Sequence, residues 1–400
     1  MWKEIYIETI KKIVRSSKTH IVSIFTVLAI VLYVGIILPN TQPMDTVDME
    51  RLEIDMQANK NIMEDREKTG KTEANSFTGI STYQRAKNEY ASQRSFKTTI
   101  ETGNAKRLIQ NPYMPEKLGK EIQDHYLMNS PFPLKDMRYD QTNKHMRLQN
   151  YLEEVNDISF HMIQEKTAWQ QIHLLFLNWG PIILSALVVF LVSDVVTRER
   201  QERTQKAGVP YGWRRYLFVQ SIAAFSFVVL FIFVALVLFW LATGVMFGFG
   251  SSQLNVPHFS YLTDYGSSGD EYGLMTIGSF MIQILPFFLL ITYLMVRMSG
   301  LFSLWFKHDV VVMAAGFFAL MFEKLYFDRR MRGIAGIPLG FYPQTYIDYG
   351  KIVSGEKSFL LNTDSITIQR GIVVLLVTIG FIEGLLWISA TIKHRQKYLR

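Results

Sequence analysis

The sequence predicts an all-α integral membrane protein with six transmembrane helices. Three observations lead to this fold class. Six runs of about 18 residues or more are apolar and carry few charges, which is the length of helix that crosses a bilayer. Lys and Arg gather in the segments that would lie on one side of the membrane. A polar segment, residues 39–172, separates the first two runs and is long enough to fold as a domain.

The six apolar runs divide the chain into spans and loops. The fifth run is the least membrane-like, because Glu323 and Lys324 lie near its far end. No small-x-small cleavage pattern follows the first run, so we expect it to remain as a signal anchor. The predicted spans are residues 21–38, 173–193, 216–243, 273–296, 309–327 and 371–392.

Basic residues predict that both termini lie in the cytoplasm, with the protein in the cell membrane. Bases are frequent in residues 1–20, in the loops 194–215 and 297–308 and in the tail 393–400. The loop 244–272 has three acidic residues and no Lys or Arg. The net charge of +7 is mostly this bias and requires no nucleic-acid partner.

Three arginines run against this rule on the predicted outer side. Arg329, Arg330 and Arg332 lie between the fifth and sixth spans. Either they contact lipid phosphates or acidic residues of the protein, or they form a site for an anionic ligand or lipid. Both interpretations are open.

Residues 1–20 predict an amphipathic elbow helix on the cytoplasmic surface. Apolar residues recur at i, i+3 and i+4 spacing, and bases fill much of the remaining surface. A basic helix of this kind lies flat in the headgroup layer. It is either a simple membrane anchor or an elbow that also touches a cytoplasmic partner.

The polar segment 39–172 predicts a mainly helical extracellular domain. The chain has no cysteine, so packing alone must hold this domain together. Apolar residues follow helical spacing from Leu148 to Ile163, and Leu52, Met56 and Met63 form a weaker stripe. The domain is either a spacer or a ligand-binding domain.

Residues 328–370 predict a re-entrant or interfacial segment on the outer side. The segment is too long for a tight turn, is divided by Gly and Pro, and is rich in aromatic residues. Irregular backbone at membrane depth is tolerated where protein buries it or where it lines a cavity.

Glu383 is the most deeply placed charge of the predicted spans, about ten residues from the cytoplasmic end of the sixth. Burying a carboxylate there is costly unless it is paired, hydrated or protonated. It serves either a proton-linked step or a cationic substrate, or it is an internal hydrogen-bond partner for another span.

The sequence does not favour an enzyme. It has no G-x-x-x-x-G-K-[ST] phosphate loop, no H-E-x-x-H and no G-x-S-x-G. Its histidines are scattered, without a partner at metal-ligand spacing. We therefore expect no catalytic residue, metal site or cofactor in this chain.

The charged loop TRERQERTQKAGVPYGWRRYLFVQ links the second and third spans. Together with the elbow, the outer domain and the broken segment before the last span, it resembles the permease subunit of a type-2 ABC exporter, which has the type V fold. The closing PQTYIDYGKIVSGEKSFLLNTDSITIQRGIVVLL is similar to Gram-positive members, many of which handle peptides, bacteriocins or other membrane-active compounds. The resemblance covers the membrane part and not the outer domain.

The resemblance implies that the loop 194–215 is a coupling helix that docks on a separate ATPase subunit, which binds Mg-ATP. The alternative is a solvated loop that only follows the positive-inside rule. The implied docking residues are Arg198, Glu199, Gln201, Glu202, Arg203, Gln205 and Lys206.

The resemblance also implies a second permease subunit, identical or related, that meets this one through the first and fifth spans. Ala314, Ala315 and Gly316 would allow close approach there. An outer gate would be formed by Phe341, Tyr342, Tyr346 and Tyr349.

The function expected from this resemblance is export of an amphipathic or hydrophobic substrate, such as a peptide, bacteriocin or antimicrobial. The alternative is a polytopic sensor or immunity protein whose outer domain binds a peptide without transport.

Overall fold

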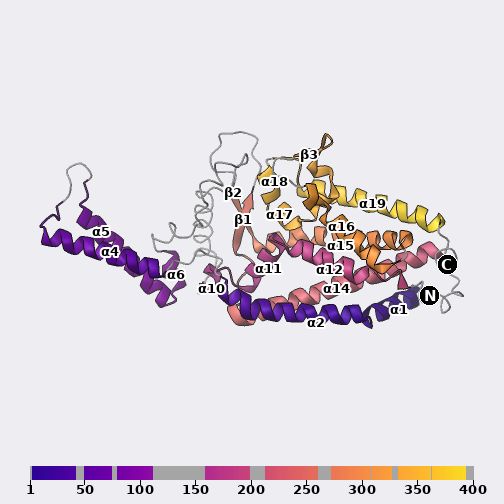
Figure 1. Ribbon diagram of the computed structural model, residues 1–400, viewed down its shortest axis with the longest axis horizontal. Coiled ribbons are helices and arrows are strands. Elements are labelled where there is room, and N and C mark those ends of the chain that lie inside the picture. Colours follow the sequence, from indigo (N-terminus) through magenta and orange to yellow (C-terminus); the bar gives the residue numbers. More distant parts are fainter. Residues whose placement is uncertain are drawn as a thin grey trace.

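The computed structural model is an elongated bundle of long helices, with a pair of helices projecting from one end (Figure 1). Most of the described residues are helical, as the sequence predicts. The structure describes residues 2–41, 49–73, 79–110, 158–198, 212–259, 272–306, 308–326, 332–361 and 363–392.

The centre of the bundle is α15 (Ile277–Trp305). It packs against α12 (Gly180–Val192), α14 (Trp213–Phe247), α16 (Asp309–Tyr326) and α19 (Ile368–Ile392). Its buried residues recur along the whole helix, and they belong to the largest hydrophobic cluster of the chain. The other helices of the bundle leave many large apolar side chains exposed, which suits a surface that faces lipid.

Four of the described helices are long and apolar enough to cross a membrane: Ser17–Asn40, Trp213–Phe247, Ile277–Trp305 and Ile368–Ile392. A fifth span is reached if the bent pair Phe160–Leu177 and Gly180–Val192 is counted as one. The first member contains α10 (Phe160–Ile163) and α11 (Ala168–Leu177), and the second is α12. The chain therefore carries the apolar helices of a membrane protein, four or five in its described part against the six predicted.

The remaining predicted span, residues 309–327, coincides with α16. This helix contains Asp309, Glu323 and Lys324 within its 18 residues. Three charges lower its hydropathy, and they are the reason that composition alone does not identify it as a span.

The predicted second span is bent rather than straight. The axes of the helices before and after Asn178–Trp179 differ by 73°. Pro181 explains the break, because it has no N–H to continue the helix and its ring would meet the carbonyl of Leu177. Gly180 lies so close to the carbonyl oxygen of Leu175 that a Cβ atom would collide with it.

The all-α prediction omitted two small antiparallel sheets. Strand β1 (Asn255–Phe259) pairs with β2 (Tyr272–Thr276), and β3 (Gly333–Ile334) pairs with β4 (Ile337–Pro338). A short apolar run does not distinguish a buried strand from the start of a helix, so the prediction assigned residues 273–276 to the fourth span.

The fourth span is displaced along the chain relative to the prediction. Its helix, α15, begins after Thr276, whose hydroxyl accepts a hydrogen bond from the N–H of Ser279 as an N-cap. It continues to Trp305, so Arg297 lies inside the helix and not in the predicted loop 297–308. The helix also accommodates Pro286 in its interior.

Two projecting helices make up most of the described outer segment. α4 (Met49–Lys68) and α5 (Thr82–Glu101) lie side by side and point away from the bundle, and the short α6 (Ala105–Ile109) follows (Figure 1). The side chain of Ser81 caps the first turn of α5. These helices agree with a mainly helical domain, whereas most of the predicted stripe from Leu148 lies outside the described residues.

The base of the projecting pair is attached to the bundle by a second hydrophobic cluster. Leu52 of α4 and Phe96 of α5 are buried there with Val256 of β1 and Ile277 of α15. Ile163 of α10 (Phe160–Ile163) joins the same cluster. The helices α4 and α5 are therefore connected to the central helix of the bundle through the β1–β2 sheet.

The C-terminal end of the helix Ser17–Asn40 is also bonded to α11 and to the residue Lys166 before it. The helix α2 (Ser17–Leu32) passes through a π-helical turn, Tyr33–Ile37, into α3 (Leu38–Asn40). The Tyr33 hydroxyl donates to Gln171 at 2.9 Å, and Lys166 donates to the Pro39 carbonyl at 3.0 Å.

The end of the bundle opposite to α4 and α5 gathers several chain segments (Figure 1). The helix α1 (Trp2–Val14) packs there on the first turns of α14, with Ile5 buried against Tyr216 and Val219. The last turns of α19 and α12 lie at this end as well. This agrees with the predicted placement of residues 1–20 and the end of the last span on one side, with the outer segment on the other.

We expect single cysteines to reveal which end faces the cytoplasm, because the natural chain has none. Arg94 is exposed on α5 and Lys3 is exposed on α1. In intact cells, an impermeant thiol reagent should label Arg94→Cys and should label Lys3→Cys only after the membrane is permeabilised. Labelling at residue 3 but not at residue 94 in intact cells would reverse the predicted orientation.

Candidate functional site

A charged cluster lies at the beginning of the predicted coupling loop, residues 194–215. Asp194 follows α12, and its carboxylate is nearly buried. It forms ion pairs with Arg198, one helical turn later, and with Lys18 of α2 at 3.7 Å. Lys18 also donates to Asp309, the first residue of α16, at 3.1 Å. We call Lys18, Asp194, Arg198 and Asp309 the Asp194 cluster.

The Asp194 cluster also holds the corner between α1 and α2. The Arg198 guanidinium donates to the backbone carbonyl of Lys12 at 3.3 Å and to the hydroxyl of Ser16. A guanidinium with several donors in a fixed plane is well suited to joining such acceptors. The beginning of the 194–215 loop is therefore bonded to α1 and to the start of α2, and Lys18 connects it further to α16.

Of the predicted coupling residues, Arg198 is the one that the structure describes. Glu199, Gln201, Glu202, Arg203, Gln205 and Lys206 lie outside the described ranges. Sequence analysis did not single out Asp194, Lys18 or Asp309. The available signal was the i,i+4 spacing of Asp194 and Arg198 at the end of an apolar run.

A second charged cluster lies inside the bundle, around Arg297 of α15. Its guanidinium forms two hydrogen bonds with the carboxylate of Glu383 on α19, the Nη2–Oε2 distance being 2.5 Å. Arg297 also donates to the hydroxyl of Ser221 on α14 at 2.8 Å. The hydroxyl of Tyr293 donates to Glu383 at 2.9 Å.

Glu383 therefore has the partner in another helix that one of its two interpretations expects. The Arg297 side chain is 6% exposed and that of Glu383 is 33% exposed. The bidentate hydrogen bonds give each charged group a partner of opposite charge where hydration is limited. A role of Glu383 in proton or substrate handling stays a prediction.

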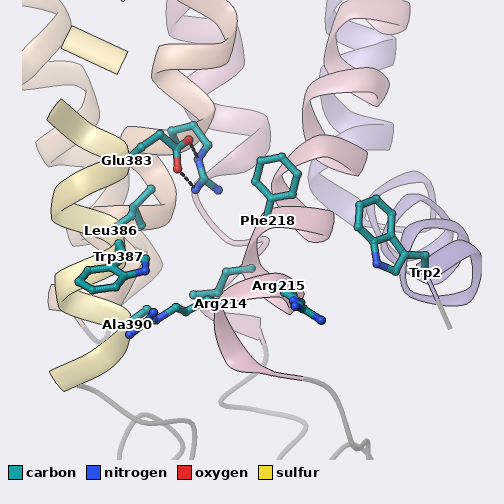
Figure 2. Close-up of a pocket in the computed structure, with 10 residues that line it drawn as sticks. Trp2, Arg214, Arg215, Phe218, Glu383, Leu386, Trp387 and Ala390 are labelled. Carbon is teal, nitrogen blue, oxygen red and sulfur yellow. Dashed lines mark hydrogen bonds and ion pairs between the residues drawn. The ribbon is translucent and has the colours of Figure 1, made fainter. Parts of the chain in front are cut away.

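A pocket of about 400 Å³ opens beside this pair (Figure 2). Its walls come from α1, α14, α15 and α19. Arg214 and Arg215, at the start of α14, extend in different directions, and Arg214 points toward Trp387. The Arg214 guanidinium lies 4.2 Å from the Trp387 ring centroid and donates to Thr391.

At the opposite end of the bundle, Lys357 and Glu323 form a buried ion pair. Lys357 lies on α18 (Glu356–Leu361) and Glu323 on α16, and both side chains are about 5% exposed or less. Lys357 also donates to the carbonyl of Thr345 at 2.7 Å. The pair attaches α18 to α16.

The four residues of the predicted outer gate occupy different environments. Tyr346 and Tyr349 are buried, whereas Phe341 is 53% exposed and Tyr342 is half-buried. Phe341 and Tyr346 lie on the 3-10 turns Leu339–Phe341 and Pro343–Tyr346, Tyr342 lies between these turns, and Tyr349 begins α17 (Tyr349–Val353).

The two buried tyrosines pack within this chain. The Tyr346 ring stacks on Phe287 with centroids 6.2 Å apart, and its hydroxyl donates to the Gly340 carbonyl at 2.7 Å. Burial raises the pKa of Tyr346 to about 12, so the phenol stays neutral and continues to donate. Tyr349 lies beside Phe176 of α11. Opening a gate here would require these contacts to separate, and the gate stays a prediction.

The small residues of α16 face different directions. Gly316 is buried against α12, and a Cβ atom there would lie 2.6 Å from Cγ1 of Val189. Ala315 is half-buried and Ala314 is exposed. Gly316 thus serves close packing within this chain, while Ala314 is free to meet a second subunit.

Comparison of the chain with protein-family models, with curated proteins and with solved structures finds no match in any of the three.

We expect Gly316→Ala to destabilise the helix bundle by about 1–3 kcal/mol, because its methyl group would press on Val189. Val189→Ala in the same chain should restore part of the loss. The measurement is the unfolding midpoint of the purified protein in detergent. Gly380→Ala on α19 is the control, since a Cβ atom there meets nothing within 4 Å. Equal stability of the Gly316 and Gly380 variants would contradict the packing described.

We expect Glu383→Gln to lower the free energy of unfolding by roughly 2–4 kcal/mol, because Arg297 would stay buried without its counter-charge. The double variant Arg297→Leu with Glu383→Leu should be more stable than Glu383→Gln, since it removes both charges. Glu89→Gln, which breaks the exposed Arg85–Glu89 pair of α5, should cost less than about 1 kcal/mol. Similar losses for Glu383→Gln and Glu89→Gln would show that Arg297 does not depend on the carboxylate.

Proposed function

We propose that this chain is the permease subunit of an ATP-driven exporter of the type-2 ABC class. In this proposal α16 also crosses the membrane, as the fifth of six spans, α1 is the elbow, and the 194–215 loop is the coupling element. The single observation that carries the proposal is the Asp194 cluster, which bonds the start of this loop to the α1–α2 corner and, through Lys18, to α16.

The Asp194 cluster gives the loop a means of moving other helices. A displacement of the loop would act directly on Asp194 and Arg198, and through Lys18 on α2 and α16. The motion would continue into the core, because α16 packs closely on α12 at Gly316 and both helices pack on α15. Rigid-body movement of packed helices is the usual form of such transitions.

The proposed substrate is amphipathic or hydrophobic, such as a peptide or an antimicrobial compound. An apolar groove of about 790 Å³ lies between α11, α14 and α15, with Trp169, Phe233 and Phe288 among its lining residues. Inside the described bundle, Arg297 forms an ion pair with Glu383, and Lys357 forms an ion pair with Glu323. Each of these charges therefore has a partner of opposite charge within the protein. A hydrated ion would find few free charges along such a surface, whereas an apolar substrate would be solvated by it.

The chain carries no phosphate loop, so the energy would come from a separate ATPase subunit that binds Mg-ATP. A second permease subunit, identical or related, would complete the pore. The exposed faces of α2 and α16, which include Phe25, Val310 and Phe318, are the surfaces that the family arrangement would place at that contact.

The second candidate function is a sensor or immunity protein that binds a peptide without transporting it. The observation that favours it is the projecting α4–α5 pair, which extends well beyond the bundle (Figure 1). Both functions place a peptide-sized ligand on the outer side. They differ in the requirement for an ATPase.

We expect the chain to co-purify with an ATPase subunit from its native membrane, identified by mass spectrometry. Arg200→Glu with Arg203→Glu should release that subunit, because both charges lie in the proposed docking segment. Lys18→Gln should retain the subunit but lose stimulation of ATP hydrolysis, since it breaks the link from the loop to α16.

The matched control is Arg85→Glu with Arg94→Glu on α5, which makes the same charge change at the other end of the bundle. This variant should bind and stimulate the ATPase normally. Recovery of a histidine kinase and no ATPase would favour the sensor function. Normal binding and stimulation in the Arg200→Glu, Arg203→Glu variant would exclude the loop as the coupling element.

A further inference from the structure

The pocket beside Arg297 has an excess of positive charge. Three guanidinium groups line it, those of Arg214, Arg215 and Arg297, and one carboxylate, that of Glu383. The carboxylate is already bonded to Arg297 through both of its oxygens. Two positive charges at the mouth of the pocket are therefore left without a counter-charge from its lining.

Arg215 is the group most open to a ligand. It is exposed and has no hydrogen-bond or ion-pair partner among the residues that the structure describes. Arg214 is held against Trp387 and Thr391, neither of which neutralises it. Both arginines lie in the first turn of α14, whose N-cap, Gly212, supplies no side-chain acceptor. The unsatisfied N–H groups of this turn add to the positive potential.

The apolar walls of the pocket indicate that its ligand is an amphiphile rather than a soluble anion. Phe218, Leu386 and Ala390 line it between the charged groups (Figure 2). Trp2 and Trp387 flank it from α1 and α19, and both are more than half exposed. Exposed tryptophans beside arginines, at the end of apolar helices, mark the headgroup level of a bilayer. Basic pockets between such helices bind anionic lipid headgroups.

We propose that this pocket binds the phosphate of an anionic phospholipid, with Arg215 and Arg214 on the headgroup and the apolar wall of α14 and α19 along its acyl chain. Arg297 and Glu383 form the inner limit of the site. The bound lipid would brace α1, α14 and α19 against each other, since each of them contributes a side chain to the pocket. The inference does not depend on whether the protein is an exporter.

The test is native mass spectrometry of the full-length protein in a neutral detergent, titrated with phosphatidylglycerol or phosphatidylcholine. The wild-type protein should retain phosphatidylglycerol in preference to phosphatidylcholine. Arg215→Gln should weaken the tightest phosphatidylglycerol site about tenfold, the loss expected for one charge-assisted phosphate contact. Arg215 is exposed and without a partner in the described part of the chain, so this variant should fold and insert normally.

The matched control is Arg15→Gln, which removes one exposed charge at the same end of the bundle and does not line the pocket. It should leave the tightest site unchanged. Inorganic phosphate at the same concentration should not displace the lipid. Equal weakening by Arg15→Gln would show a general attraction between charges and would overturn the proposal. So would equal retention of phosphatidylcholine, or Arg215-dependent binding of inorganic phosphate alone.

Discussion

The interior of the bundle contains a guanidinium, that of Arg297, which must find hydrogen-bond acceptors and a counter-charge within the protein. Arg297 lies on the central helix, where it has little access to water, and an unpaired charge there would cost several kcal/mol. Its acceptors come from two other helices, Glu383 on α19 and Ser221 on α14. These bonds link the central helix to α19 and α14 at that depth, in addition to the apolar packing between the same helices.

The helix α16 shows how charge can hold an element that composition barely marks as a span. Its first residue, Asp309, is bonded to Lys18, and Glu323, near its other end, is bonded to the buried Lys357. Between them, Gly316 allows α12 to approach closely. The charges that lower the hydropathy of α16 are thus the groups that fasten it to the α1–α2 corner at one end and to α18 at the other.

Much of the architecture could be predicted from the sequence, because it follows from local pattern. Apolar runs indicated α14 and α19 to within a few residues, and helical spacing indicated α1. The grouping of basic residues indicated which elements share one end of the bundle. Patterns of this kind involve residues that are near each other in the chain, so they can be recognised in the sequence without knowledge of the fold.

What could not be predicted depends on contacts between distant segments. Glu383 was recognised as a buried charge, but its partner Arg297 was assigned to a loop, because the helix extends beyond the apolar run. Asp194 pairs with Lys18, near the start of the chain, and Lys18 in turn pairs with Asp309, so this cluster joins segments that are distant in the sequence. The bend at Pro181 was missed because hydropathy averaged over a window does not register one missing N–H.

The α4–α5 pair is attached to the bundle only at its base among the described contacts, so a rotation at the base would move its far end the most. The point of attachment is the cluster of Leu52 and Phe96 with Val256 and Ile277. Lys68, at the far end of α4, lies roughly 25 Å from Leu52 at the rise of an α-helix. A tilt of about 10° about this cluster would move the tip of α4 by about 4 Å, while the side chains beside Ile277 would shift by a fraction of this distance. A force applied at the tip therefore produces a larger torque about this cluster, and so about the first turn of α15, than the same force applied near Leu52.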